Sequence, residues 1–189
     1  MEYNHPSDIV KDLNFGDNAK SKIIAGVDKL TKAVRSTLGA SGKCVIYEDA
    51  RGKPVITKDG VTVAESVVLY DPVENIGATL IKEAARNTVK EAGDGTTTAT
   101  VLAESLLKTV NLDSYKDEPI RKVKDGINTG LKKINKYLSD NSTPVSGNML
   151  QSVSAISCNN DIKLGKIIAD AYTRVGTDGV VLMLSLIHI

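Results

Sequence analysis

The stretch from Asp71 to Val110 constrains the fold most, because it encodes two helices joined by a very short turn. Asp71, Pro72 and Glu74 supply an N-cap, a first-turn proline and a capping-box acid, which together predict a helix start. Apolar residues then recur at helical spacing and form a predicted buried stripe: Ile76, Leu80, Ile81, Ala84, Ala85 and Val89. Gly93 is the residue type that ends a helix in the left-handed region. A second apolar pattern after Gly93 predicts that another helix follows directly.

Helical periodicity also dominates the rest of the chain. A helix with Asp17 as its N-cap is predicted to extend to Leu38, where Gly39 follows as a helix-ending residue. Three more helices are predicted from about Pro119 to Leu138, from Met149 to Ile156 and from Ile162 to Val175.

Short β-favouring runs at 44–47 and 55–57 flank a polar turn and predict a hairpin. Lys58, Asp59 and Gly60 are predicted to form a turn that leads from the hairpin into the run 61–63. The nearly all-apolar run 180–189 is interpreted as a strand that is cut short. The expected fold class is therefore mostly α with a small β-hairpin.

The composition narrows the range of partners. With 24 basic and 23 acidic residues, the formal net charge is 24 − 23 = +1, which gives no general attraction for nucleic acid or an anionic membrane. One Phe and no Trp leave few stacking platforms for single-stranded nucleic acid. No apolar run reaches membrane-spanning length, and Cys44 and Cys158 are too far apart in sequence for a zinc or disulfide pattern. We expect a cytoplasmic protein that binds neither nucleic acid nor membrane.

Three separated loops each place glycine beside polar or charged groups. They are Thr37-Leu38-Gly39-Ala40-Ser41-Gly42, Lys58-Asp59-Gly60 and Gly93-Asp94-Gly95-Thr96-Thr97-Thr98. Any one of them could be only a helix stop and a helix start without a ligand. Together they favour a magnesium-nucleotide site, because glycines admit a phosphate to the backbone and a helix start offers free N–H groups. A P-loop is excluded, since the spacing is too short and Cys44 stands where a P-loop has Ser or Thr.

The run Ala92–Ala103 resembles the ATP-site signature of the group I (GroEL-type) chaperonins. Further similar segments occur in the same order: Phe15–Ala19, Thr37–Gly39, Ile56–Val61 and Ile156–Ser157 followed by Asn159. The resemblance covers residues from about Asn14 to Val181. It implies the first part of an equatorial ATP-binding domain at 1–142 and the first segment of a partial α/β intermediate domain at 143–189. The apical domain of that family would be absent, and we expect a truncated reading frame.

The resemblance also implies roles for individual residues, with ATP and Mg²⁺ as cofactors. Thr37, Leu38, Gly39 and Ala40 would form the nucleotide loop, Lys58 would contact the phosphates, and Gly95, Thr96, Thr97 and Thr98 would cradle phosphate oxygens. Asp94 would hold magnesium, and Asp59 would act as the catalytic carboxylate that polarises the attacking water. The family loop usually reads Gly-Pro-Lys-Gly where this chain reads Gly39-Ala40-Ser41-Gly42, so it lacks one positive charge.

The function implied is that of an ATP-dependent chaperone subunit that assists protein folding. Its partners would be other subunits of a ring, together with unfolded clients and a co-chaperonin that bind the missing apical domain. The family is an ATPase, but a second catalytic aspartate would lie in the missing part, so this chain is expected to bind ATP rather than turn it over. Two alternatives stay open: a non-enzymatic module that joins a ring of complete subunits, and an unrelated small nucleotide-binding enzyme.

Overall fold

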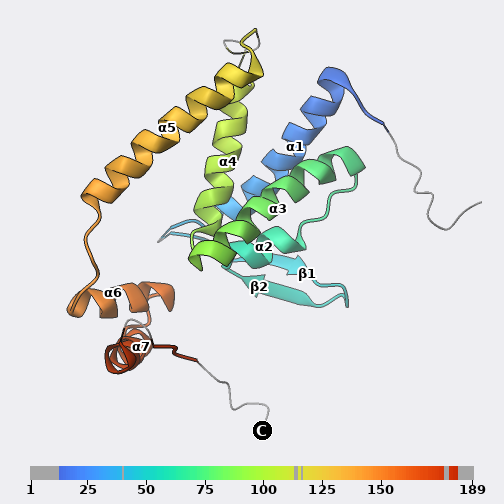
Figure 1. The fold of residues 1–189 in the computed structure, drawn as a ribbon. Coiled ribbons are helices and arrows are strands. Elements are labelled where there is room, and N and C mark those ends of the chain that lie inside the picture. Colours follow the sequence, from blue (N-terminus) through green and yellow to red (C-terminus); the bar gives the residue numbers. More distant parts are fainter. Residues whose placement is uncertain (1–12, 40, 113–114, 116, 177–178, 183–189) are drawn as a thin grey trace, which may run out of the picture. The chain divides into compact units, whose positions relative to one another are not determined.

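The computed structural model describes residues 13–39, 41–112, 115, 117–176 and 179–182, which divide into two compact units, 1–124 and 125–189 (Figure 1). The helices are α1 (Gly16–Arg35), α2 (Gly60–Ser66), α3 (Pro72–Ala92), α4 (Thr96–Val110), α5 (Ile120–Asn141), α6 (Asn148–Ser157) and α7 (Ile162–Val175), and the strands are β1 (Val45–Glu48) and β2 (Pro54–Thr57). The mostly helical fold class with one small hairpin is confirmed. The expected boundary between 142 and 143 stays a prediction.

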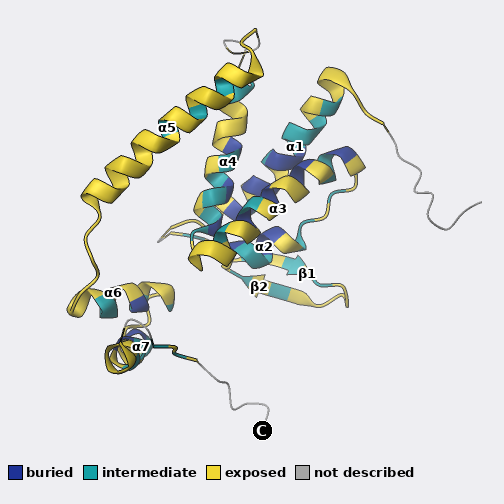
Figure 2. Ribbon diagram, viewed as in Figure 1, coloured by how far each residue is buried: buried dark blue, intermediate teal, exposed yellow. Residues whose placement is uncertain are grey.

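The core of the first unit forms where α1 and α3 cross, with α2 and α4 alongside (Figure 2). Two glycines allow the backbones of α1 and α3 to approach closely where they cross. A Cβ added at Gly26 of α1 would lie 1.8 Å from the carbonyl oxygen of Glu74, and one added at Gly77 of α3 would lie 2.1 Å from that of Ile23. The buried residues of this core are Val27, Leu30, Val34, Val63, Ala64, Ala78 and Ile81.

Helix α3 begins and ends as its sequence predicts. The Asp71 carboxylate accepts hydrogen bonds from the N–H groups of Val73 (2.8 Å) and Glu74 (3.2 Å), and Pro72 is the first helical residue. Gly93 ends the helix with φ 73° and donates its N–H to the carbonyl of Val89 at 2.8 Å.

The predicted apolar stripe of α3 was only partly right. Ile81 and Ala85 are buried, but Ile76 and Leu80 are 54% and 58% exposed. The face that packs on α1 instead passes through Gly77, because only a residue without a side chain lets the two backbones approach so closely.

The start of α1 also differs from the prediction. The N-cap is Phe15 rather than Asp17, and α1 already ends at Arg35 rather than Leu38. Gly16 adopts φ 71°, which turns the chain into the helix two residues early and leaves Asp17 in the first turn, where its charge suits the helix dipole.

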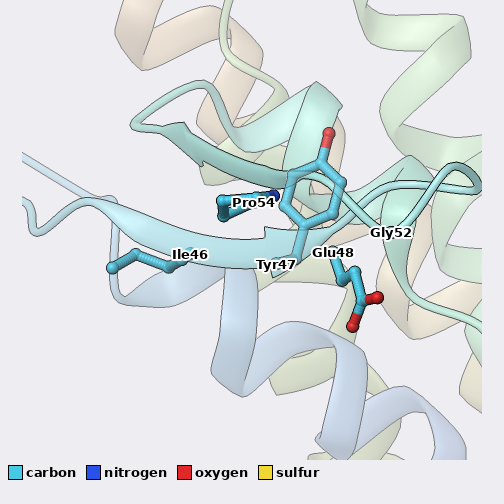
Figure 3. A pocket seen from close by; sticks show the side chains of 5 residues that line it. All are labelled: Ile46, Tyr47, Glu48, Gly52 and Pro54. Atoms are coloured by element: carbon cyan, nitrogen blue, oxygen red, sulfur yellow. The ribbon is translucent and has the colours of Figure 1, made fainter.

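The predicted hairpin is present as the antiparallel pair β1 and β2, in which Ile46 faces Ile56 and Glu48 faces Pro54. Figure 3 shows neighbouring side chains of β1 on opposite faces, with an open pocket on the hairpin lined by Ile46, Tyr47, Glu48, Gly52 and Pro54. Val45 packs against the core, so one face of the hairpin is held on the helices while Ile46 and Ile56 are exposed.

A network of charged side chains joins α1 to α4. Glu104 of α4 forms ion pairs with Arg35 of α1 and, at 2.7 Å, with Lys108 of its own helix. Lys108 also lies 2.5 Å from Asp28, which pairs with Lys32 at 2.7 Å. Hydrogen bonds from Lys108 and then from Lys32 hold the pKa of the Asp28 carboxyl well below its usual range.

In the second unit, α6 and α7 pack against each other at a third glycine. A Cβ added at Gly165 would lie 2.5 Å from Cα of Ala155. Described residues 179–182 carry no strand, and residues 183–189 of the expected strand lie outside the described residues. Among the helices that the structure describes, none has both the length and the apolar character required to cross a membrane.

We predict that Gly77→Ala lowers the free energy of unfolding by about 1–3 kcal/mol, because the new methyl group overlaps the α1 backbone. The matched control is Gly126→Ala on α5, where no described atom outside the helix backbone lies within 4 Å and the change should raise stability by about 0.5–1 kcal/mol. Urea denaturation measures the free energy of unfolding of both variants. Equal effects of the two substitutions would contradict the close crossing of α1 and α3.

We predict that Asp28→Asn destabilises the chain at neutral pH and that this loss shrinks in acid. The pKa of Asp28 is lower in the folded state than the value of about 4 in an unfolded chain, so its stabilisation is fully present above about pH 4 and fades as the pH falls below it. Urea midpoints of the two proteins across this pH range provide the measurement. The exposed Asp125→Asn serves as the control, and a difference that stays constant with pH would refute the expectation.

Candidate nucleotide site

The turn between α3 and α4 is built by two glycines in the left-handed region. Gly93 has φ 73° and Gly95 has φ 86°, conformations that L side chains rarely adopt. Gly95 is the N-cap of α4, and no described side chain caps this helix. The first N–H groups of α4 therefore keep their capacity to donate hydrogen bonds to a ligand.

The threonines at the start of α4 are not equivalent. Thr96 is only 8% exposed, and its carbonyl accepts a hydrogen bond of 2.9 Å from the buried hydroxyl of Thr100. Thr97 is half-buried and Thr98 is exposed. Thr96 thus fixes the first turn of the helix, while the side chains of Thr97 and Thr98 are accessible.

Gly60 brings two of the predicted loops together. A Cβ added at Gly60 would lie 2.1 Å from Oγ1 of Thr97 and 3.5 Å from Cγ1 of Val34. Gly60 directly follows Lys58 and Asp59, Thr97 belongs to the α4 start, and Val34 lies just before Thr37. The ends of α1 and β2 and the beginnings of α2 and α4 therefore meet at one point.

Asp59 occupies a position that the sequence did not reveal. The residues after it form the helix α2 rather than a simple turn, and Asp59 is the N-cap of that helix. Its carboxylate accepts hydrogen bonds from the N–H of Thr62 (2.9 Å), the N–H of Val61 (3.3 Å) and the hydroxyl of Thr62. Burial raises the pKa of this carboxyl, but these hydrogen bonds outweigh the burial and hold the pKa below its usual value.

Lys58 precedes this cap, and both Lys58 and Asp59 are exposed. They directly precede Gly60, which lies against Thr97 at the start of α4. Aspartate is among the residue types preferred at N-caps, and this preference of Asp59 is the one local signal for α2.

The loop after α1 is folded back on itself. Lys43 donates its N–H to the carbonyl of Ser36 at 2.8 Å, and Gly42 donates to the carbonyl of Gly39 at 3.0 Å. A Cβ added at Gly42 would lie 2.2 Å from the carbonyl oxygen of Thr37, so this second glycine of the loop is needed for its shape. The Thr37 hydroxyl donates to the carbonyl of Val34 at 2.8 Å.

At the tip of this loop, Gly39 has φ 76° and Leu38 is 44% exposed. Ala40 lies outside the described residues. Among the described residues of this loop, Ser41 is exposed as well, so the accessible side chains include one apolar group and one hydroxyl.

Asp94 is exposed, and its carboxylate accepts a hydrogen bond of 2.6 Å from the N–H of Gly95. Within the described residues there is no group of three or more His, Cys, Asp or Glu side chains that could by itself hold a metal ion. A single carboxylate fits Mg²⁺ bound together with phosphate oxygens and water, which is the usual arrangement for this ion in nucleotide sites. It does not fit a metal held by protein ligands alone.

Comparison with known proteins finds a chaperonin family model and chaperonin relatives. The model of the TCP-1/cpn60 chaperonin family matches residues 30–188. Chaperonin GroEL 1 of Rhodopirellula baltica is 43% identical over 180 residues, which cover 92% of this chain and 31% of that protein.

Solved chaperonin structures share the fold. Chaperonin gp146 from the bacteriophage EL 2 (Pseudomonas aeruginosa), crystallised in the presence of ATP-BeFx, superposes with a TM-score of 0.74 at 29% identity over 84% of this chain and 28% of that one. A group III chaperonin in the open state gives a TM-score of 0.70 at 30% identity over 83% of this chain and 32% of that one. The chain spans about a third of the length of each of these relatives. With a match to the family over residues 30–188, this chain belongs to the TCP-1/cpn60 chaperonin family.

Proposed function

We propose that this chain provides the first part of the ATP-binding domain of a chaperonin subunit, with residues 1–142 in the equatorial domain and 143–189 in the intermediate domain. The observation that supports the proposal is the meeting of Val34, Gly60 and Thr97, which brings the Lys58–Gly60 loop against the start of α4, with the end of α1 beside them.

The phosphates would be held at the start of α4. Its uncapped N–H groups and the positive end of the helix dipole attract an anion, and Gly95 lets the phosphate approach the backbone. Thr97 and Thr98 add hydroxyl donors, and Lys58 adds a positive charge from the neighbouring loop. The loop Thr37–Ala40 would contact the nucleotide farther from these charges.

Asp94 would hold Mg²⁺, which neutralises phosphate charge when bound. The N–H of Gly95 fixes one carboxylate oxygen of Asp94 and leaves the other for the ion. Asp59 would orient the attacking water as its general base. The N-cap hydrogen bonds keep Asp59 ionised and fix its direction, and a carboxylate has enough acceptor sites to bind a water as well.

In the whole protein, the proposed activity is ATP hydrolysis that drives assisted protein folding in a ring of subunits. Unfolded proteins and a co-chaperonin would be the further partners, bound outside the part described. The chaperonin relatives and the match to the family support this proposal. We also propose a cytoplasmic location, which agrees with the free thiols of Cys44 and Cys158.

We predict that Asp94→Asn abolishes the effect of Mg²⁺ on nucleotide binding and weakens binding of the Mg²⁺ complex by about tenfold or more. Asparagine keeps the acceptor for Gly95 N–H, so the turn should be preserved. The measurement is fluorescence titration of the 189-residue chain with a fluorescent ATP analogue, with MgCl₂ and with EDTA. Glu91→Gln, an exposed carboxylate three residues earlier, is the matched control. The proposal fails if the unmodified chain binds no analogue or if both variants respond to Mg²⁺ as it does.

We predict that Thr62→Val raises the pKa of Asp59, because it removes the hydroxyl that helps to stabilise the carboxylate. Thr62→Ser, which keeps the hydroxyl, should leave that pKa nearly unchanged. Titration of the Asp59 side-chain carbon by NMR distinguishes the two variants. If both titrate alike, hydrogen bonding by Thr62 does not control the charge of Asp59.

A further inference from the structure

Glu104 is the most buried charged side chain among the described residues, and none of the proposed roles in nucleotide binding uses it. The residue is 1% exposed and lies on α4, eight residues after Thr96. At 1.5 Å per residue, this separation is about 12 Å along the helix. Glu104 therefore lies too far along α4 to be part of the phosphate cradle itself.

The partners of Glu104 come from both helices. One carboxylate oxygen pairs with Arg35 of α1 and the other with Lys108 of α4, and the side chains of both cations are 50% exposed. Burying an ionised carboxylate costs several kcal/mol unless it is paired, so the two cations are needed to keep it there. An apolar residue at this position could pack in the same place without that cost. A buried ion pair is thus a poor choice for stability alone, and its directional contacts point to a role in orientation.

The pairs also define how the two helices run. Asp28 pairs with Lys108, while Arg35 pairs with Glu104. The two helices are therefore antiparallel. The C-terminal end of α1 consequently lies toward the N-terminal end of α4. The meeting of Val34 and Thr97 at Gly60 agrees with this direction.

Arg35 is the last residue of α1 and stands two positions before Thr37. We propose that Glu104 is a positioning residue of the nucleotide site, which holds Arg35 and thereby fixes the Thr37–Gly39 loop relative to the phosphate cradle at the start of α4. This inference rests on the proposed function, because it concerns the same nucleotide. Glu104 itself would touch neither the nucleotide nor the metal ion.

The test is Glu104→Gln in the 189-residue chain, titrated with the fluorescent ATP analogue and MgCl₂. We expect binding to weaken by about fivefold or more, the usual lower range for coupling between distinct sites. Arg35→Gln should have a similar effect, and Arg35→Lys, which keeps the cation, should bind more tightly than Arg35→Gln. The matched control is Glu74→Gln, which breaks the ion pair between Lys29 of α1 and Glu74 of α3 and leaves α4 untouched.

A second measurement needs no nucleotide. The N–H groups of Gly42 and Lys43 close the loop after α1, so their hydrogen exchange reports whether that loop is held. We expect faster exchange of these two amides in Glu104→Gln and Arg35→Gln but not in Glu74→Gln. If Glu104→Gln fails to fold, Arg35→Gln carries both measurements, since it leaves Glu104 paired with Lys108.

The outcomes separate the two proposals. If the unmodified chain binds the analogue and the Glu104 and Arg35 variants bind it equally well, the positioning role is wrong and the nucleotide site stands. The same holds if these variants lose only stability against urea, with loop exchange and affinity unchanged. If the unmodified chain binds no analogue, the proposed function and the positioning role are both overturned.

Discussion

The first unit depends on a contact that exists because Gly60 has no side chain. Thr97 Oγ1 would lie 2.1 Å from a Cβ at that position, and Val34 approaches the same point from α1. The hairpin strand β2 therefore delivers Lys58 and Asp59 directly beside the first turn of α4. Gly26 and Gly77 also lack side chains at the crossing of α1 and α3, where each lies against the backbone of the partner helix. Close contacts at glycine therefore shape both the core and the candidate site.

Features that depend on neighbours in sequence could be predicted from the sequence. The start of α3 at Asp71 and its end at Gly93 follow from local hydrogen bonds and a single left-handed residue, and both were confirmed. The hairpin followed from two β-favouring runs and a turn. The three loops proposed to bind the nucleotide were recognisable by their glycines and polar residues, although only the structure shows that Gly60 lies against Thr97 and Val34.

Features that depend on distant contacts escaped prediction. Helix α2 escaped prediction for a different reason: the β-branched residues after Asp59 favour a strand, and they outweighed the preference of Asp for N-cap positions. The packed face of α3 was displaced from Ile76 and Leu80 toward Gly77, since closeness of the partner backbone outweighs apolar area there. The ion pair of Glu104 with Arg35 joins residues 69 positions apart in the chain, and neither α1 nor α4 shows it by its own periodicity.

The first turn of α4 begins after the N-cap Gly95 and has no capping side chain among the described residues, so an anion bound as proposed would accept the hydrogen bonds of its first N–H groups. Binding of the anion and ordering of the first turn of α4 would then be thermodynamically linked, so that each favours the other. Departure of the anion would return the N–H groups to water and loosen Thr97, whose hydroxyl lies against Gly60. Under the proposed function, loss of the anion would therefore also affect helix α2, because α2 begins at Gly60.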